Sequence, residues 1–242
     1  MEAGETALWI MRSGVGKSTT LKWTGMQAAR LGYRVLHIQL EGSAEEAYDK
    51  YTQVWTAQSY SVIKNGDLSG AALEKCEKIA SDMLKMNKDV TIYSFEKFNS
   101  ASVGDIREIV MDYQKVNGHF PDLLIVDSLD LLVPDHSTKF GVDTQSIKMK
   151  LQMSAQLLKN MSLEFRPMRT LTATQTGDVP PTIYNDPDKV ITRNNTEGDR
   201  TLIKSFSYVF TFNQTDKEAK DKEGRIFCFF IVTGKQIGRA HV

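Results

Sequence analysis

The chain has 242 residues with 30 basic and 30 acidic side chains, and 41% of the residues are hydrophobic. This length suits one large domain, and the composition excludes wholesale disorder. A net charge of zero excludes a generally polycationic nucleic-acid binder, but it is compatible with a local basic groove. No apolar run approaches the ~18 residues of a membrane span, and the N-terminus is unlike a signal peptide. The two cysteines, Cys76 and Cys228, are far apart, so we expect no disulfide framework and a reducing compartment.

Short apolar runs alternate with longer helical patterns along the chain, which predicts an α/β fold with a mostly parallel central sheet and helices on both faces. The predicted strands are Thr6–Ile10, Arg34–Leu40, Val90–Phe95, Leu123–Asp127, Thr170–Thr174, Tyr208–Phe212 and Ile226–Val232. The predicted helices are Lys17–Leu31, Ala44–Trp55, Ala71–Met86, Val103–Val116 and Thr144–Met161. The stretch Gly177–Arg200 is rich in Pro, Asn, Asp and Thr, which predicts a long loop.

The first strand leads through a glycine-bearing turn into Lys17, Ser18 and a helix, which is the setting of a phosphate-binding P-loop. Two glycines let backbone N–H groups wrap phosphates, and the helix N-terminus favours an anion. Lys17 can reach the β- and γ-phosphate oxygens, and the Ser18 hydroxyl can ligate Mg²⁺. The sequence departs from the full pattern at Met11, where glycine is usual. The predicted nucleotide-binding residues are Ser13, Gly14, Val15, Gly16, Lys17, Ser18 and Thr19.

Three polar residues end other predicted strands, and the carboxyl ends of parallel strands share one ligand-binding crevice. Glu41 follows the second strand, where a carboxylate can orient and deprotonate an attacking water. Asp127 ends the apolar run LLIV and matches a Walker B acid that holds Mg²⁺ together with Ser18. Gln175 ends the strand TLTAT, where a neutral amide can sense the γ-phosphate. Asp130 is a second acid just beyond Asp127.

These signals together resemble the RecA-like motor domain of DnaB-type replicative helicases, most closely in YRVLHIQLEGSAEEAY, PDLLIVDSLDLL and TLTATQTGD. The resemblance implies a RecA-like P-loop NTPase that uses ATP and Mg²⁺, with Glu41, Lys17 and Gln175 as catalytic residues. It further implies 5′–3′ translocation on single-stranded DNA, a hexameric ring, a primase or helicase loader as partner, and a cytoplasmic location without membrane attachment.

The sequence departs from that family in several places. The family has Tyr-Leu-Gln after its Walker B acid, where this chain has Ser-Leu-Asp ending at Asp130. Lys235 and Arg239 do not fit the family's Lys-x-Arg finger, so we assign none. Ile237–Val242 resembles the translation of a common sequencing adapter, which predicts a non-native tail after a core of residues 1–236, truncated at both ends. The candidate DNA-contacting cations are Lys139, Arg193 and Arg200.

Other ATPases share much of this pattern. A recombinase or regulatory ATPase of the RecA or KaiC type would use the same site residues. A partitioning-type P-loop ATPase resembles GVGKSTT and GYRVLHIQLE, but it usually has Lys at the position of Arg12. A nucleotide-binding regulatory or packaging-associated module without motor function is a further alternative. The histidines lack metal-ligand spacing, so we expect no zinc.

Overall fold

The computed structural model describes residues 1–86, 90–95, 100–133, 147–177, 179–186, 189, 191, 200–221, 225–230 and 236–241. Its centre is an eight-stranded sheet in the order β3-β2-β4-β5-β1-β6-β7-β8. In this order, the first six strands, β3 through β6, pair in parallel, and β7 and β8 add antiparallel pairs at the other edge. The strands are β1 (Thr6–Met11), β2 (Val35–Gln39), β3 (Val90–Ser94), β4 (Leu123–Asp127), β5 (Arg169–Gln175), β6 (Tyr208–Asn213), β7 (Arg225–Phe230) and β8 (Gln236–His241).

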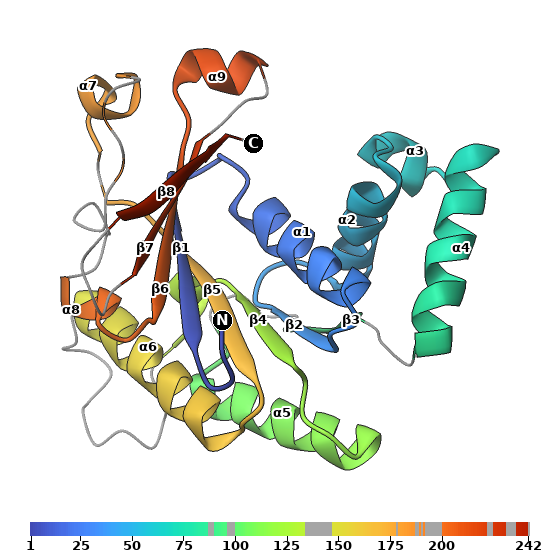
Figure 1. Cartoon of the computed structure of the whole chain (residues 1–242), viewed down its shortest axis with the longest axis horizontal. Helices are drawn as coiled ribbons and strands as arrows, with labels where there is room; N and C mark the ends of the chain where they lie inside the picture. The colour runs from blue at the N-terminus through green and yellow to red at the C-terminus, as the bar shows by residue number, and fades with distance from the viewer. Residues whose placement is uncertain are drawn as a thin grey trace.

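Helices cover both faces of the sheet (Figure 1). One face packs against α1 and, beyond it, α2, and the other packs against α5, α6 and α8. The longer helices are α1 (Lys17–Arg30), α2 (Ala44–Thr56), α4 (Ala71–Met86), α5 (Val103–Asn117) and α6 (Ile147–Glu164). The shorter ones are α3 (Tyr60–Lys64), the 3₁₀ turn η1 (Leu129–Leu131), α7 (Pro181–Tyr184), α8 (Arg200–Ile203) and α9 (Asp216–Asp221).

The two faces are filled by alternate residues of the same strands. In β4, Leu123 and Ile125 join the core beneath α1, whereas Leu124 and Val126 join the core beneath α5 and α6. Successive side chains of a strand point to opposite faces, so a strand covered on both sides must be apolar throughout. This explains why LLIV carries no polar residue before Asp127. Helix starts are capped as well: Ser43 accepts the Glu46 backbone N–H at 3.1 Å.

The predicted α/β fold class is confirmed, and the predicted strands and long helices recur with ends that differ by only a few residues. Residues 144–146 of the last predicted helix and 231–232 of the last predicted strand lie outside the described part of the chain. Three expectations change. The loop predicted for 177–200 contains α7, because Pro181 starts a helical turn readily, although residues 178, 187–188, 190 and 192–199 lie outside the described part. The short helices α3 and α9 were not predicted, because so few residues show no periodicity. Finally, residues 236 and 238–241 of β8 pair with β7, in a stretch for which we made no fold prediction.

Met11 explains how the P-loop dispenses with its usual first glycine. It is the last residue of β1, and its side chain is fully buried in the core beneath α1. Its carbonyl oxygen accepts the Thr176 backbone N–H at 2.9 Å. Met11 therefore has ordinary strand geometry, and the backbone turn that requires glycine starts later, at Gly14 and Gly16, with φ of 79° and 94°.

Gly25 allows α1 to approach α2 and β4 closely. A Cβ atom at this position would lie 2.5 Å from the Tyr51 hydroxyl oxygen and 2.8 Å from Ile125 Cδ1. Both distances are shorter than a van der Waals contact, so α1 would have to move away. The position of the P-loop depends on α1, which begins at Lys17.

We predict that Gly25→Ala lowers the free energy of unfolding by about 1–3 kcal/mol, because overpacking outweighs the gain of about 1 kcal/mol that alanine brings to a helix. Urea unfolding of the two proteins checks this. The double variant Gly25→Ala/Tyr51→Phe, which removes one clashing atom, should recover part of the loss. A single variant as stable as the original protein would contradict the prediction.

Candidate active site

A cavity of about 400 Å³ lies at the carboxyl edge of the parallel sheet. Lys17 and Ser18 line it from the start of α1, Glu41 from beyond β2, Asp127 from the end of β4 and Gln175 from the end of β5. All five were predicted from sequence to act at one site, and the fold brings them together. The remaining wall consists of Lys22, Gln39, Gly42, Glu46, Lys50, Ser128, Asp130 and Leu131.

The other predicted nucleotide-binding residues lie on the turn before α1 and in its first turn. Gly16 adopts a left-handed conformation at the N-cap, and no side chain caps the helix there. The first backbone N–H groups of α1 therefore have no capping side chain, as a helix that receives an anion requires. Ser13, Gly14 and Val15 complete the turn, and Thr19 is exposed in the first turn of α1. None of these residues lines the cavity itself.

Asp127 is the most deeply buried acid that lines the cavity, with 6% of the residue exposed. One carboxylate oxygen accepts the Ser18 hydroxyl at 3.0 Å, and the other accepts Lys22 Nζ at 3.1 Å. Burial alone would raise the pKa of this carboxyl group. The charge of Lys22 and the hydrogen bonds from Ser18 and Lys22 outweigh that effect and hold the pKa below its usual value. Asp127 is therefore a carboxylate at neutral pH.

Lys22 is a residue of the cavity that was not predicted from the sequence. Its side chain is only 1% exposed, and Asp127 is its ion-pair partner at 3.1 Å. Burial lowers the pKa of Lys22, and the Asp127 carboxylate opposes that shift. The only signal in the sequence was the position of this lysine on the core-facing side of the predicted helix. A buried lysine needs a partner, so that position implies an acid nearby.

The Ser18 and Asp127 oxygens suit a magnesium ion. Mg²⁺ prefers hard oxygen ligands in an octahedron at about 2.1 Å, so two neighbouring ligands lie about 3 Å apart. The Ser18 hydroxyl oxygen and the nearer Asp127 carboxylate oxygen are 3.0 Å apart. Few protein ligands are needed, because Mg²⁺ usually keeps several waters.

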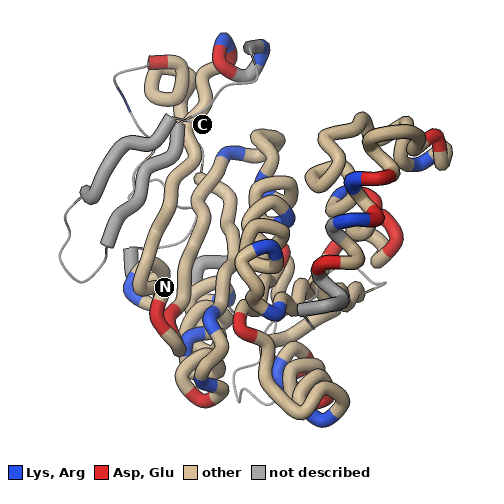
Figure 2. The backbone as a smooth tube through the Cα atoms, turned by 45° about the vertical axis from the view of Figure 1, so that its right-hand side comes forward, with Lys and Arg blue, Asp and Glu red and all other residues tan. Residues whose placement is uncertain are grey.

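Charge is divided between the two helices beside the cavity. Every charged position of α1 is basic, namely Lys17, Lys22 and Arg30, whereas α2 carries three acids and Lys50 (Figure 2). Lys50 and Glu46 face the cavity from α2, and neither was predicted to belong to the site. Glu46 also lies in the first turn of α2, where an acid is favoured by the helix dipole.

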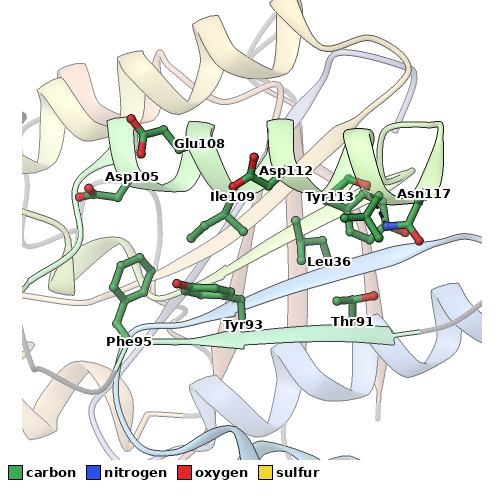
Figure 3. Close-up of a pocket in the computed structure, with 11 residues that line it drawn as sticks. Leu36, Thr91, Tyr93, Phe95, Asp105, Glu108, Ile109, Asp112, Tyr113 and Asn117 are labelled. Carbon is green, nitrogen blue, oxygen red and sulfur yellow. Dashed lines mark hydrogen bonds between the residues drawn. The ribbon is translucent and has the colours of Figure 1, made fainter.

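A second cavity, of about 430 Å³, lies between α5 and the sheet edge formed by β3 (Figure 3). Leu36, Tyr93 and Phe95 from the sheet side and Ile109 from α5 give it an apolar lining, and Asp105, Glu108 and Asp112 follow α5 beside it. It is slightly larger than the first cavity but contains no residue of the P-loop. We therefore assign the chemistry to the first cavity.

The predicted DNA-contacting cations are not placed by the structure. Lys139 and Arg193 lie outside the described residues, and Arg200 is described only as the backbone start of α8. Across the part of the chain that the structure describes, no helix combines the length and apolar character needed to cross a bilayer.

The fold has close counterparts among solved structures. One solved ATPase domain matches with a TM-score of 0.79 and 14% sequence identity over 100% of this chain and 81% of that chain. A DnaB-like replicative helicase, described with its interactions with primase, matches with a TM-score of 0.78 and 14% identity. That match covers 99% of this chain and 56% of that chain. No family model and no curated protein match the sequence. The chain therefore has the RecA-like fold of helicase ATPase domains.

His37 provides a pH-dependent test of this site. The ring is fully buried, and one nitrogen lies 2.8 Å from the Tyr51 hydroxyl oxygen. Burial, and then the charge of Lys22, lower the pKa of His37 to about 3. Unfolded histidine has a pKa of about 6.5, so between pH 3 and 6.5 the unfolded chain binds the extra proton. Stability is therefore lost as the pH falls.

We predict that protonation of this one histidine in the unfolded chain lowers the free energy of unfolding by about 2 kcal/mol when the pH falls from 7 to 5. Urea unfolding at both pH values measures the loss. His37→Gln, whose amide can still bond to Tyr51, should show a loss smaller by that amount. If both proteins lose the same amount of stability, the pH dependence does not come from His37.

Proposed function

We propose that the chain is the ATP-hydrolysing motor of a DnaB-type replicative DNA helicase. The observation that carries the proposal is the meeting of Lys17, Ser18, Glu41, Asp127 and Gln175 around one cavity, at the end of a P-loop turn. The fold shared with the solved ATPase domain and the DnaB-like helicase supports the same conclusion. A recombinase or regulatory ATPase of the RecA or KaiC type would use the same residues and is the alternative to test.

In this proposal the turn at Gly14 and Gly16 and the start of α1 bind the phosphates through backbone N–H groups. Lys17 binds the β- and γ-phosphate oxygens. Ser18 and Asp127 would hold Mg²⁺, which when bound would neutralise charge on the phosphate oxygens. Lys22 keeps the Asp127 carboxylate ionised and in place through its bond of 3.1 Å.

Glu41 is the proposed general base. It is exposed and lines the cavity two residues beyond β2, so it can reach both water and nucleotide. It takes a proton from the attacking water as the water oxygen bonds to the γ-phosphorus and the bond to the ADP oxygen breaks. Gln175 adjoins the same space and is proposed to sense the γ-phosphate. The segment that follows it in the chain would then respond to the nucleotide.

The proposal extends to partners. The motor acts as a homo-oligomer, a hexameric ring that translocates 5′–3′ on single-stranded DNA, and a primase or loader binds to it. The DnaB-like helicase of similar fold interacts with primase, which supports such a partner. A neutral chain is compatible with a DNA channel, because each subunit of a ring contributes only a few of the cations.

We predict that Glu41→Gln binds ATP normally but hydrolyses it about 10²–10⁴-fold more slowly, because only the proton acceptor is lost. Lys17→Ala should lose nucleotide binding. Calorimetry and phosphate release measure the two effects. Glu45→Gln, a change of an exposed acid that does not line the cavity, is the matched control. Normal turnover by Glu41→Gln would exclude Glu41 as the base.

The helicase itself is tested with forked DNA. We expect single-stranded DNA to stimulate ATP hydrolysis and the protein to unwind a duplex that carries a free 5′ tail, with Glu41→Gln inactive in both assays. Unwinding only from a 3′ tail would refute the proposed direction. Strand exchange without unwinding would favour the recombinase, and ATP hydrolysis indifferent to DNA would favour a regulatory ATPase.

A further inference from the structure

Asp130 is held rigidly at the cavity by the turn η1. Leu129, on one side of it, is fully buried in the core beneath α5 and α6, and Leu132 is 6% exposed in the same core. The turn closes with backbone bonds from Leu131 to Ser128 and from Leu132 to Leu129. The backbone that carries Asp130 is therefore anchored in the core, and its side chain lines the cavity.

Three donors converge on this one carboxylate. Lys17 Nζ donates to Oδ2 at 2.9 Å, and the Gln175 backbone N–H donates to the same oxygen at 3.1 Å. The Thr174 hydroxyl donates to Oδ1. Asp130 thus links the P-loop lysine to the end of β5. Of its three hydrogen bonds, only the one from Lys17 involves a residue that is proposed to bind phosphate.

Lys17 is largely occupied by these neighbours. Its ammonium group has three protons, and it donates to Ser128 Oγ at 2.8 Å as well as to Asp130. The side chains of Lys17 and Asp130 are 18% and 16% exposed, so the ion pair is partly shielded from solvent. A phosphate that binds Lys17 must compete with the carboxylate that already holds it.

We propose that Asp130 is a positioning residue that acts as a built-in competitor of phosphate: it holds Lys17 in the nucleotide-free protein and lowers the affinity for nucleotide. The inference rests on the proposed function, because both concern the same P-loop. Thr174 and Gln175 keep the carboxylate in place after Lys17 is released. A bound γ-phosphate therefore faces a fixed negative charge, and like charges in a shielded site repel. In the family that the sequence resembles, a neutral glutamine stands at this position.

The test is the affinity of Asp130→Asn for ADP and for a non-hydrolysable ATP analogue, measured by calorimetry with Mg²⁺ present. Asparagine has nearly the same shape, so it removes the charge and retains an oxygen for the Gln175 N–H. We expect binding to tighten about tenfold, since bonds to charged groups contribute that much. The nucleotide-free variant should unfold at the same or a lower temperature. A purely structural residue would not improve binding when it is replaced.

Asp112→Asn is the matched control, because it makes the same charge change at an exposed acid that pairs with Lys115 on α5. Its affinity for nucleotide should equal that of the original protein. Asp130→Gln serves as a second variant if Asp130→Asn does not fold, and it should tighten binding in the same way. The inference is overturned if the original protein binds nucleotide and the folded Asp130 variants bind equally or more weakly. A failure of the original protein to bind any nucleotide would instead refute the proposed function, and this inference with it.

Discussion

The arrangement of the site depends on the buried ion pair between Lys22 and Asp127. It joins the middle of α1 to the end of β4, and Ser18 adds a second bond from α1 to the same carboxylate. Removal of both charges from water is costly, so such a pair persists only with good geometry and further hydrogen bonds. Loss of one partner would leave a buried charge unpaired, at a cost of about 3–5 kcal/mol. The pair therefore fixes the distance between the P-loop helix and the acid that faces it.

Several other features support this pair. Gly25 lets α1 lie close enough to Tyr51 and Ile125, and His37 fills the space beside Asp127 as a neutral ring. A neutral histidine there adds no positive charge to compete with Lys22. The core beneath α1 and the polar cluster above it are thus parts of one packing arrangement, which explains why a substitution as small as Gly25→Ala is expected to affect the whole site.

Asp127 and Asp130 contact different partners at the end of β4. Asp127 faces Ser18 and Lys22, whereas Asp130, one 3₁₀ turn further on, faces Lys17 and the end of β5. One short segment therefore contacts the helix start, the P-loop lysine and the neighbouring strand at once. Through Asp130, this segment connects the phosphate site with Gln175 at the end of β5.

Sequence patterns by themselves predicted the fold class and five of the residues that line the cavity, because both depend on local signals. Alternating apolar runs predict covered parallel strands, and polar residues at strand ends such as Glu41 and Gln175 must then meet at one edge. The partners of those residues were decided by tertiary structure alone. In the sequence Lys22 is an ordinary helix lysine, and only the packing of α1 on β4 shows its partner Asp127. Asp130 is likewise an ordinary turn acid in the sequence, and only the fold brings Lys17 and Thr174 to it. Short helices such as α7 and α9 also escaped prediction, because their few residues show no helical period. Periodicity gives the direction in which a side chain faces, but only packing of distant segments determines which charge it meets there.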